Sequence, residues 1–166
     1  MKDLQIKTDK GETTMLINKI VIGCDHAGYA LKEQIKQYLA GKGVEMLDVG
    51  CYSTDACNYP DIAHALCTEI QSGAYTTGIL ICGTGIGMSM CATKHAGIRA
   101  ACCSDVFSAR MTRMHNDANV LCFGARVVGY GVACDLVDAF LDQKFEGERH
   151  APRVAAINAL DESEKK

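Results

Sequence analysis

Short apolar segments alternate with amphipathic ones along almost the whole chain, and this alternation limits the folds open to it. Runs typical of β-strands occupy residues 19–23, 44–50, 77–83, 98–104 and 119–125. Helical spacing of apolar residues predicts helices over 29–43, 59–73, 86–97, 105–114, 129–143 and 152–162. Strands that alternate with helices indicate parallel βαβ units with right-handed crossovers. We therefore expect an α/β fold: a three-layer α/β/α Rossmann-like domain with a five-stranded parallel sheet.

Length and charge place the chain among ordinary globular domains. It has 166 residues, of which 48% are apolar and 22% charged, which argues against disorder. The net charge of −3 gives no electrostatic basis for binding nucleic acid or an anionic membrane. Apolar runs reach about six residues, too short to span a bilayer. We expect residues 1–18, polar and of mixed charge, to be a poorly ordered extension, and residues 19–162 to be one domain.

The chain is rich in cysteine. Its ten cysteines include no C-x-x-C pair, which argues against a structural zinc site, and we expect no bound metal. Several lie inside apolar runs, where cysteine acts as a small hydrophobic residue. The first 19 residues lack the apolar core of a secretory signal. Reduced thiols and a cytoplasmic location are therefore the simpler expectation.

Reactive residues cluster in the loops next to the predicted strands and helices. Ligands of open parallel sheets bind beyond the carboxyl ends of the strands, where the strand order switches. The loops that carry reactive or charged side chains are GCDHAG (23–28), CGTGIG (82–87), RMHNDAN (113–119), GARVVG (124–129) and EGERHAPR (146–153). We expect a binding site assembled from them.

The glycine loop after the third strand combines a thiol with an anion cradle. Glycines between a strand and a helix let several N–H groups converge on an anion. The loop is neither a G-x-G-x-x-G dinucleotide fingerprint nor a P-loop, and a tight turn is the plainer alternative. Cys82 stands at its mouth, where a helix N-terminus favours the thiolate. The alternative for Cys82 is a buried structural cysteine.

The other loops carry weaker signals. His115, which we expect on a loop beside Asn116, could act as an acid or base near neutral pH. Asp25 and His26 could bind a ligand, or could be a helix cap beside a solvated histidine. Arg149 and Arg153 could clamp a phosphate through bidentate hydrogen bonds, or could form a solvated face.

Seven motifs in order resemble the ribose-5-phosphate isomerase type B family, which is related to the bacterial galactose-6-phosphate isomerase subunits. They are GCDHAG, DVG, YPDIA, GILICGTGIGMS, AGIRAA, HNDANVLCFGARVVG and FEGERHAPRV, and they run from about Lys19 to Asp161. The resemblance implies interconversion of D-ribose 5-phosphate and D-ribulose 5-phosphate in the pentose phosphate pathway, through an enediolate and without cofactor. Some relatives place a glutamate base in the following helix, but GMSMCATK has no acidic residue.

The resemblance also implies roles for individual residues. Cys82 would be the general base, Thr84 would add a hydroxyl to the oxyanion cradle and His115 would help to open the sugar ring. Substrate would be held by Asp25, His26, Tyr59, Gly83, Gly85, Ile86, Gly87, Asn116, Arg126, Arg149 and Arg153. Active sites between subunits imply a homodimer or a tetramer of dimers.

Three alternatives remain open at this point. The sugar phosphate could be one carbon longer, as in allose 6-phosphate or galactose 6-phosphate. The chain could bind a sugar phosphate without turning it over, although Cys82, Thr84 and His115 together argue for catalysis. A metal-binding role for the cysteines is the most distant alternative.

Overall fold

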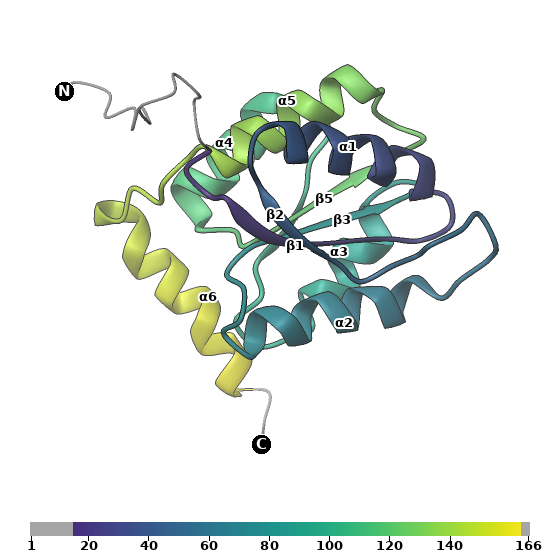
Figure 1. The fold of residues 1–166 in the computed structure, drawn as a ribbon. Helices are drawn as coiled ribbons and strands as arrows, with labels where there is room; N and C mark the ends of the chain where they lie inside the picture. Colours follow the sequence, from purple (N-terminus) through teal and green to yellow (C-terminus); the bar gives the residue numbers. More distant parts are fainter. Residues whose placement is uncertain (1–14, 164–166) are drawn as a thin grey trace.

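The computed structural model describes residues 15–163 and has one sheet between two helical layers (Figure 1). The strands are β1 (Lys19–Cys24), β2 (Glu45–Asp48), β3 (Gly78–Cys82), β4 (Ala100–Cys102) and β5 (Val120–Gly124). The helices are α1 (Tyr29–Gly41), α2 (Tyr59–Gln71), α3 (Ile86–Ala92), α4 (Val106–Asn116), α5 (Tyr130–Leu141) and α6 (Ala151–Ser163), with a short 3₁₀ turn at Glu148–His150. The predicted α/β/α fold is confirmed.

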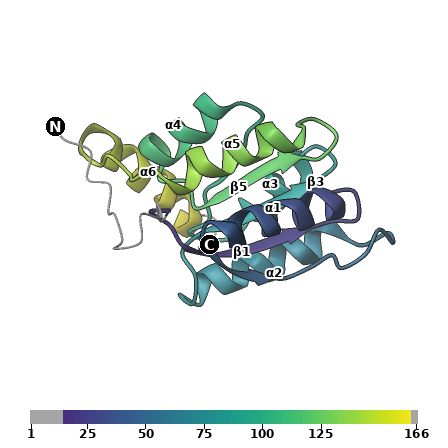
Figure 2. The same cartoon turned by 45° about the horizontal axis from the view of Figure 1, so that its top comes forward.

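All five strands are parallel, in the order β2-β1-β3-β5-β4. Helices α1, α4 and α5 cover one face, whereas α2 and α3 pack together on the other (Figures 1 and 2). The helices that follow β1 and β3 therefore leave the sheet on opposite faces. This is the switch in strand order at which open α/β sheets bind ligands.

The central strand β3 supplies both layers of the core. All five of its residues are buried. Ile79 and Ile81 belong to the cluster under α1, α4 and α5, whereas Leu80 and Cys82 belong to the cluster under α2 and α3. Alternate residues of a strand point to opposite faces, so a strand covered on both sides must be apolar throughout.

Some boundaries differ from the prediction. Helix α3 ends at Ala92, five residues early, because the chain turns through Gly97, whose φ is +76°. Helix α4 runs to Asn116, past the predicted end at 114, and stops at Asp117, where φ is +47°. His115 therefore lies in the last helical turn, and the prediction of a loop histidine was wrong. The Arg113–Asp117 ion pair, 2.7 Å long, spans this turn.

The start of the described chain packs against the domain. Met15 is buried in the core under α1 and α5, and the Ile17 N–H donates to the Leu141 carbonyl at 3.0 Å. Residues 1–14, most of the predicted extension, lie outside the described residues. None of the helices within 15–163 combines the length and apolar character needed to cross a bilayer. All ten cysteines are free thiols.

A fully buried lysine joins α1 to the end of β2. Lys32 Nζ donates to both carboxylate oxygens of Asp48, at 2.7 and 2.8 Å, and to the Cys51 carbonyl at 2.8 Å. Lys36 Nζ adds a bond of 2.6 Å to Asp48. Burial raises the pKa of Asp48, but the two lysines outweigh it, and the net pKa is lowered. The spacing of Lys32 from Ile35 and Leu39 places it on the apolar face, a signal the sequence analysis did not use.

We predict that Asp48→Asn destabilises the fold by about 2–3 kcal/mol at pH 7, because it leaves the Lys32 ammonium buried without its carboxylate. A lowered carboxyl pKa stabilises the fold above the unfolded-state pKa of about 3.9, and the contribution is lost as pH falls through the folded-state value. Urea unfolding at pH 7 and pH 3 should therefore give a smaller difference at pH 3. Glu45→Gln, a control at an exposed carboxylate beside Lys19, should shift stability by less than about 0.5 kcal/mol.

Candidate active site

The thiol of Cys82 stands at the carboxyl end of β3, where the chain turns into α3. Its Sγ accepts the Gly85 N–H at 3.0 Å, and the residue is only 6% exposed. Gly85 has φ +82°, a left-handed conformation that lets the loop fold its amide back onto the sulfur. An N–H aimed at sulfur holds the thiol in place and is a favourable partner for a negative charge there.

Strand β5 supports this loop from behind. The Ala125 N–H donates to the Cys82 carbonyl at 2.8 Å, and the Arg126 N–H donates to the Gly83 carbonyl at 3.1 Å. A β-carbon on Gly124 would lie 2.5 Å from Thr84 Cα, so the loop and the strand end touch backbone to backbone. The Arg126 side chain passes over Gly83, its Nη1 3.6 Å from where a β-carbon would stand. The Arg126 guanidinium thus lies beside the glycine loop that follows Cys82.

The turn after β1 lies next to the loop. The Asp25 N–H donates to the Ile81 carbonyl at 3.1 Å, which fixes the turn against β3. Asp25 Oδ1 accepts the N–H groups of Ala27 and Gly28, at 2.9 and 3.0 Å, so this oxygen holds the turn before α1. It does not cap the helix, because α1 has Gly28 as its N-cap and no side-chain capping bond. His26 Nδ1 is buried without a hydrogen-bond partner among the described residues.

The first turns of α2 and α3 complete this edge. The Tyr59 ring lies against Gly87, 3.0 Å from where a β-carbon would stand. Thr84 Oγ1 accepts the Ile86 N–H at 3.3 Å, and Ile86 itself is exposed. The carboxyl ends of the strands, which form the carboxyl edge of the sheet, therefore bring together the predicted site residues that follow β1, β3 and β5 or begin α2. They are Asp25, His26, Tyr59, Cys82, Gly83, Thr84, Gly85, Ile86, Gly87 and Arg126.

The remaining predicted residues lie in the same chain at the amino ends of the strands, which form the amino edge of the sheet. They are His115, Asn116, Arg149 and Arg153. Helix α4 runs back from the end of β4, so His115 and Asn116 stand shortly before β5 begins at Val120. The five residues of β3 separate the two edges by about 13 Å. Within one chain, RMHNDAN and EGERHAPR do not reach the glycine loop, because a helix reverses the chain direction before each segment. A site assembled from all five loops stays a prediction.

His115 belongs to a polar cluster at this amino edge. Its ring stacks on His150, with centroids 4.2 Å apart and planes 8° from parallel. Glu146 Oε2 lies 3.7 Å from His115 Nε2 and 3.5 Å from His150 Nε2. The sequence analysis missed Glu146, whose spacing of four residues from His150 could have indicated the contact.

The surroundings of His150 disfavour protonation of its imidazole ring. Burial lowers its pKa, and the neighbouring His115 and Arg149 lower it further. The Arg149 Nε–H donates to His150 Nε2 at 3.2 Å, so that nitrogen acts as an acceptor. Ligand atoms of His115, Glu146 and His150 lie within 4.8 Å of one another, a spacing that could hold a metal ion. The guanidinium already occupies the side of His150 that a metal would need.

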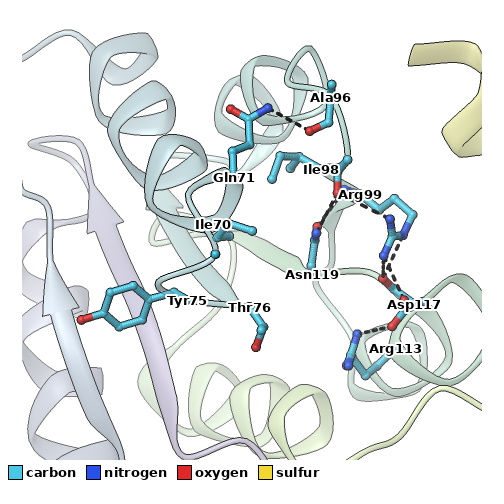
Figure 3. A pocket seen from close by; sticks show the side chains of 12 residues that line it. Ile70, Gln71, Tyr75, Thr76, Ala96, Ile98, Arg99, Arg113, Asp117 and Asn119 are labelled. Carbon is cyan, nitrogen blue, oxygen red and sulfur yellow. Dashed lines mark hydrogen bonds and ion pairs between the residues drawn. The ribbon is translucent and has the colours of Figure 1, made fainter. Parts of the chain in front are cut away.

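An arginine pair fixes the end of α4. Arg99 and Arg113 converge on Asp117, with N–O distances of 3.0 and 2.7 Å (Figure 3). These bonds line a cavity of about 710 Å³ between the end of α2 and the amino ends of β4 and β5. Because both guanidinium groups hold the residue that ends α4, they set where His115 and Asn116 stand.

Comparison with known proteins decides the family. The family model described as Ribose/Galactose Isomerase matches residues 20–157. The chain belongs to this family. Ribose-5-phosphate isomerase B of Escherichia coli (strain K12) is 47% identical over 146 residues, which cover 88% of this chain and 98% of that protein. D-erythrulose-4-phosphate isomerase of Pectobacterium atrosepticum is 44% identical over 150 residues, 88% of this chain and 97% of that protein.

A solved structure gives the same result for the fold. Ribose-5-phosphate isomerase B of Clostridium thermocellum superposes with a TM-score of 0.87 at 45% identity, over 89% of this chain and 99% of that one. The resemblance that the motifs indicated is therefore confirmed at the level of the family. This member of the Ribose/Galactose Isomerase family is a sugar-phosphate isomerase.

We predict that Gly124→Ala removes most isomerase activity, because its β-carbon can fit only if the Thr84 backbone, and with it the Cys82 loop, moves. Gly131→Ala is the matched control, since a β-carbon there meets nothing within 4 Å. We expect the control to keep normal turnover and to be neutral or up to about 1 kcal/mol more stable. Equal turnover in both variants, with equal thermal midpoints, would contradict this account of the loop.

Proposed function

We propose that this chain interconverts D-ribose 5-phosphate and D-ribulose 5-phosphate, with Cys82 as the general base. The observation that carries the proposal is the Gly85 N–H held 3.0 Å from Cys82 Sγ, at the sheet edge where the helices after β1 and β3 leave to opposite faces. A base that removes the proton alpha to a carbonyl needs donors nearby for the oxygen that becomes anionic. The loop that follows Cys82 offers consecutive amides for that purpose.

The proton moves between two neighbouring carbons. The Cys82 thiolate takes the proton from carbon 2 of the open-chain aldose, and the electron pair of that bond forms the carbon–carbon double bond of an enediolate. The loop from Gly83 to Gly87 holds the enediolate oxygens, with the Thr84 hydroxyl beside them. The hydroxyl proton on oxygen 2 passes to oxygen 1, and the thiol returns its proton to carbon 1, which leaves the ketose with its carbonyl at carbon 2. The sugar is neither oxidised nor reduced overall, so the reaction needs no redox cofactor.

The other site residues bind and open the sugar. Asp25, Tyr59 and Asn116 contact its hydroxyls, and His115 passes a proton to the ring oxygen so that the furanose opens. His26, Arg126, Arg149 and Arg153 bind the phosphate, for which the paired N–H donors of arginine are well suited. Binding the phosphate far from the reacting carbons orients them without hindering the proton transfer.

Each active site takes residues from two subunits. Cys82 and His115 lie at opposite edges of one chain, and residues so far apart cannot touch one bound pentose phosphate. A second copy related by a two-fold axis brings the amino edge of one subunit to the carboxyl edge of the other, and it forms two equivalent sites. A homodimer, alone or within a tetramer, is the smallest assembly that satisfies this condition.

We predict that the purified chain has its highest kcat/KM on ribose 5-phosphate when four-, five- and six-carbon aldose phosphates are assayed side by side. The four-carbon sugar is included because a 44% identical relative is named a D-erythrulose-4-phosphate isomerase. Cys82→Ala should lower kcat by roughly 10²–10⁴-fold while the variant stays folded. Cys91→Ala, on the following helix, should turn over normally. A Cys82→Ala variant as active as wild type would exclude this base.

We also predict that two inactive variants restore activity when they share a dimer. Co-expressed Cys82→Ala and His115→Ala chains form mixed dimers in which one of the two sites has both residues intact. Random pairing gives about a quarter of wild-type activity, since half of the dimers are mixed and each has one good site. Separate expression followed by mixing without subunit exchange is the control. Activity that never exceeds the sum of the single variants would contradict a shared site.

A further inference from the structure

Two histidines meet on the outer side of the α2–α3 layer. His64 lies in the second turn of α2, and His95 lies in the turn that follows α3. His64 Nδ1 stands 2.8 Å from His95 Nε2, and the ring centroids are 5.1 Å apart. His64 is exposed and His95 is partly exposed, so solutes can reach both rings. Neither residue takes part in the proposed function.

The backbone beneath the two rings is fixed by bonds between α2 and the end of α3. Cys67 Sγ donates to the Ala92 carbonyl at 3.9 Å, and Gln71 Nε2 donates to the Ala96 carbonyl at 2.9 Å. The His95 N–H donates to the Ala92 carbonyl at 3.0 Å. The distance between the two imidazoles is therefore set by the packing of the helices.

A hydrogen bond fixes the tautomer of His95. Its Nδ1 lies 3.1 Å from the Cys91 carbonyl, which can only accept, so Nδ1 carries the proton of the neutral ring. Nε2 is then left with a free lone pair on the side of His64. In metal sites a ligating histidine commonly donates its other ring N–H to a backbone carbonyl, which orients the ring and makes the free nitrogen more basic. His95 already has this arrangement.

The spacing of the two nitrogens suits a pair of ligands on one ion. A metal–imidazole bond is about 2.0–2.1 Å long, so two such nitrogens lie about 2.9 Å apart at a right angle and about 3.3 Å apart at the tetrahedral angle. The observed 2.8 Å differs from either value by at most about 0.5 Å. Rotation of the rings can supply this change, because the outer torsion of histidine is loosely restrained.

The neighbouring charges leave the choice of ion to the imidazoles. Asp61 precedes His64 by three residues and so shares its side of α2, whereas Lys94 is next to His95. Both are exposed, and their opposite charges offset each other. Neutral imidazole is a ligand for Zn²⁺, Cu²⁺ and Ni²⁺, whereas Mg²⁺ and Ca²⁺ prefer oxygen. The pair is therefore selective for transition metals.

We propose that His64 and His95 bind one divalent transition-metal ion, which links α2 to the turn after α3. His95 binds it through Nε2 and His64 through Nδ1, and water fills the remaining positions. The hydrogen bond between the rings is replaced by two metal–nitrogen bonds. The neutral His64 ring moves its proton from Nδ1 to Nε2 by exchange with solvent, so the neutral pair releases no net proton.

Metal binding here stabilises the folded chain. The two histidines are brought together by the packing of α2 on α3, and unfolding separates them by the 30 residues between them in sequence. An ion that binds the folded chain in preference to the unfolded chain raises the thermal midpoint. The same two helices meet at their first turns, where the Tyr59 ring lies against Gly87. The ion thus adds a second tie between them.

The test titrates Ni²⁺ into the purified, fully reduced chain by calorimetry and measures thermal midpoints with and without the metal. We expect wild type to bind one equivalent that His64→Ala and His95→Ala each bind at least about tenfold more weakly. Ni²⁺ should raise the midpoint of wild type more than that of either variant. Mg²⁺ should leave all three midpoints unchanged.

Two matched controls test the location of the ion. Cys91→Ala removes a thiol of α3 but keeps the carbonyl that orients His95. Glu146→Gln changes the separate cluster of His115, Glu146 and His150 at the amino edge. Both controls should bind the Ni²⁺ equivalent as tightly as wild type. Metal-free midpoints near that of wild type establish that the histidine variants are folded, and His95→Gln is the second variant if His95→Ala is not.

Two results would overturn the proposal. A wild-type chain that binds no Ni²⁺ would show that the pair is a hydrogen bond only. Equal Ni²⁺ affinity in wild type and in the folded histidine variants would place the ion elsewhere. The titration uses no substrate, so its result stands whether or not the chain isomerises ribose 5-phosphate.

Discussion

The parallel hydrogen-bond ladder of β1, β3 and β5 is the constraint on which the rest of the molecule depends. It aligns Cys24 with Ile81 and Cys82 with Gly124, so three chain turns leave the sheet at one edge. The helices after β1 and β3 depart to opposite faces, and the turns between them stay uncovered. Everything placed around Cys82 follows from this geometry, because the loop touches backbone on both sides and has little freedom to move.

The same ladder also keeps Cys82 and His115, the two proposed catalytic residues, apart within one chain. A helix that returns from the carboxyl edge must end at the amino edge, and α4 therefore carries His115 away from Cys82. Arg99 and Arg113 fix that helix end through Asp117, while Glu146 and His150 enclose the His115 ring. The amino edge is thus as firmly built as the thiol loop, although neither edge alone has both the proposed base and the proposed ring-opening group. The proposed function therefore requires a second subunit, and this requirement comes from topology rather than from any feature of the surface.

The buried ammonium group of Lys32 is a second constraint on the fold. Lys32 has no exposed surface, and its three short hydrogen bonds tie α1, the end of β2 and the loop beyond it into one unit. That loop leads to Tyr59 and carries Cys51 and Cys57. One buried ammonium group therefore anchors the loop that approaches the proposed substrate site, through its bond to the Cys51 carbonyl.

Local patterns in the sequence were sufficient for the sheet, the order of helices and the glycine loop, because apolar periodicity and glycine positions report directly on burial and backbone freedom. The motifs also indicated the family. Helix ends were less predictable. The last turn of α4 is spanned by the Arg113–Asp117 ion pair, and apolar periodicity carries no information about such a bond. Only the tertiary structure decided that His115 and Cys82 stand at opposite edges and that Lys32 is buried against Asp48. Each of these depends on which distant segments meet, and that is set by packing of the whole chain rather than by neighbours in sequence.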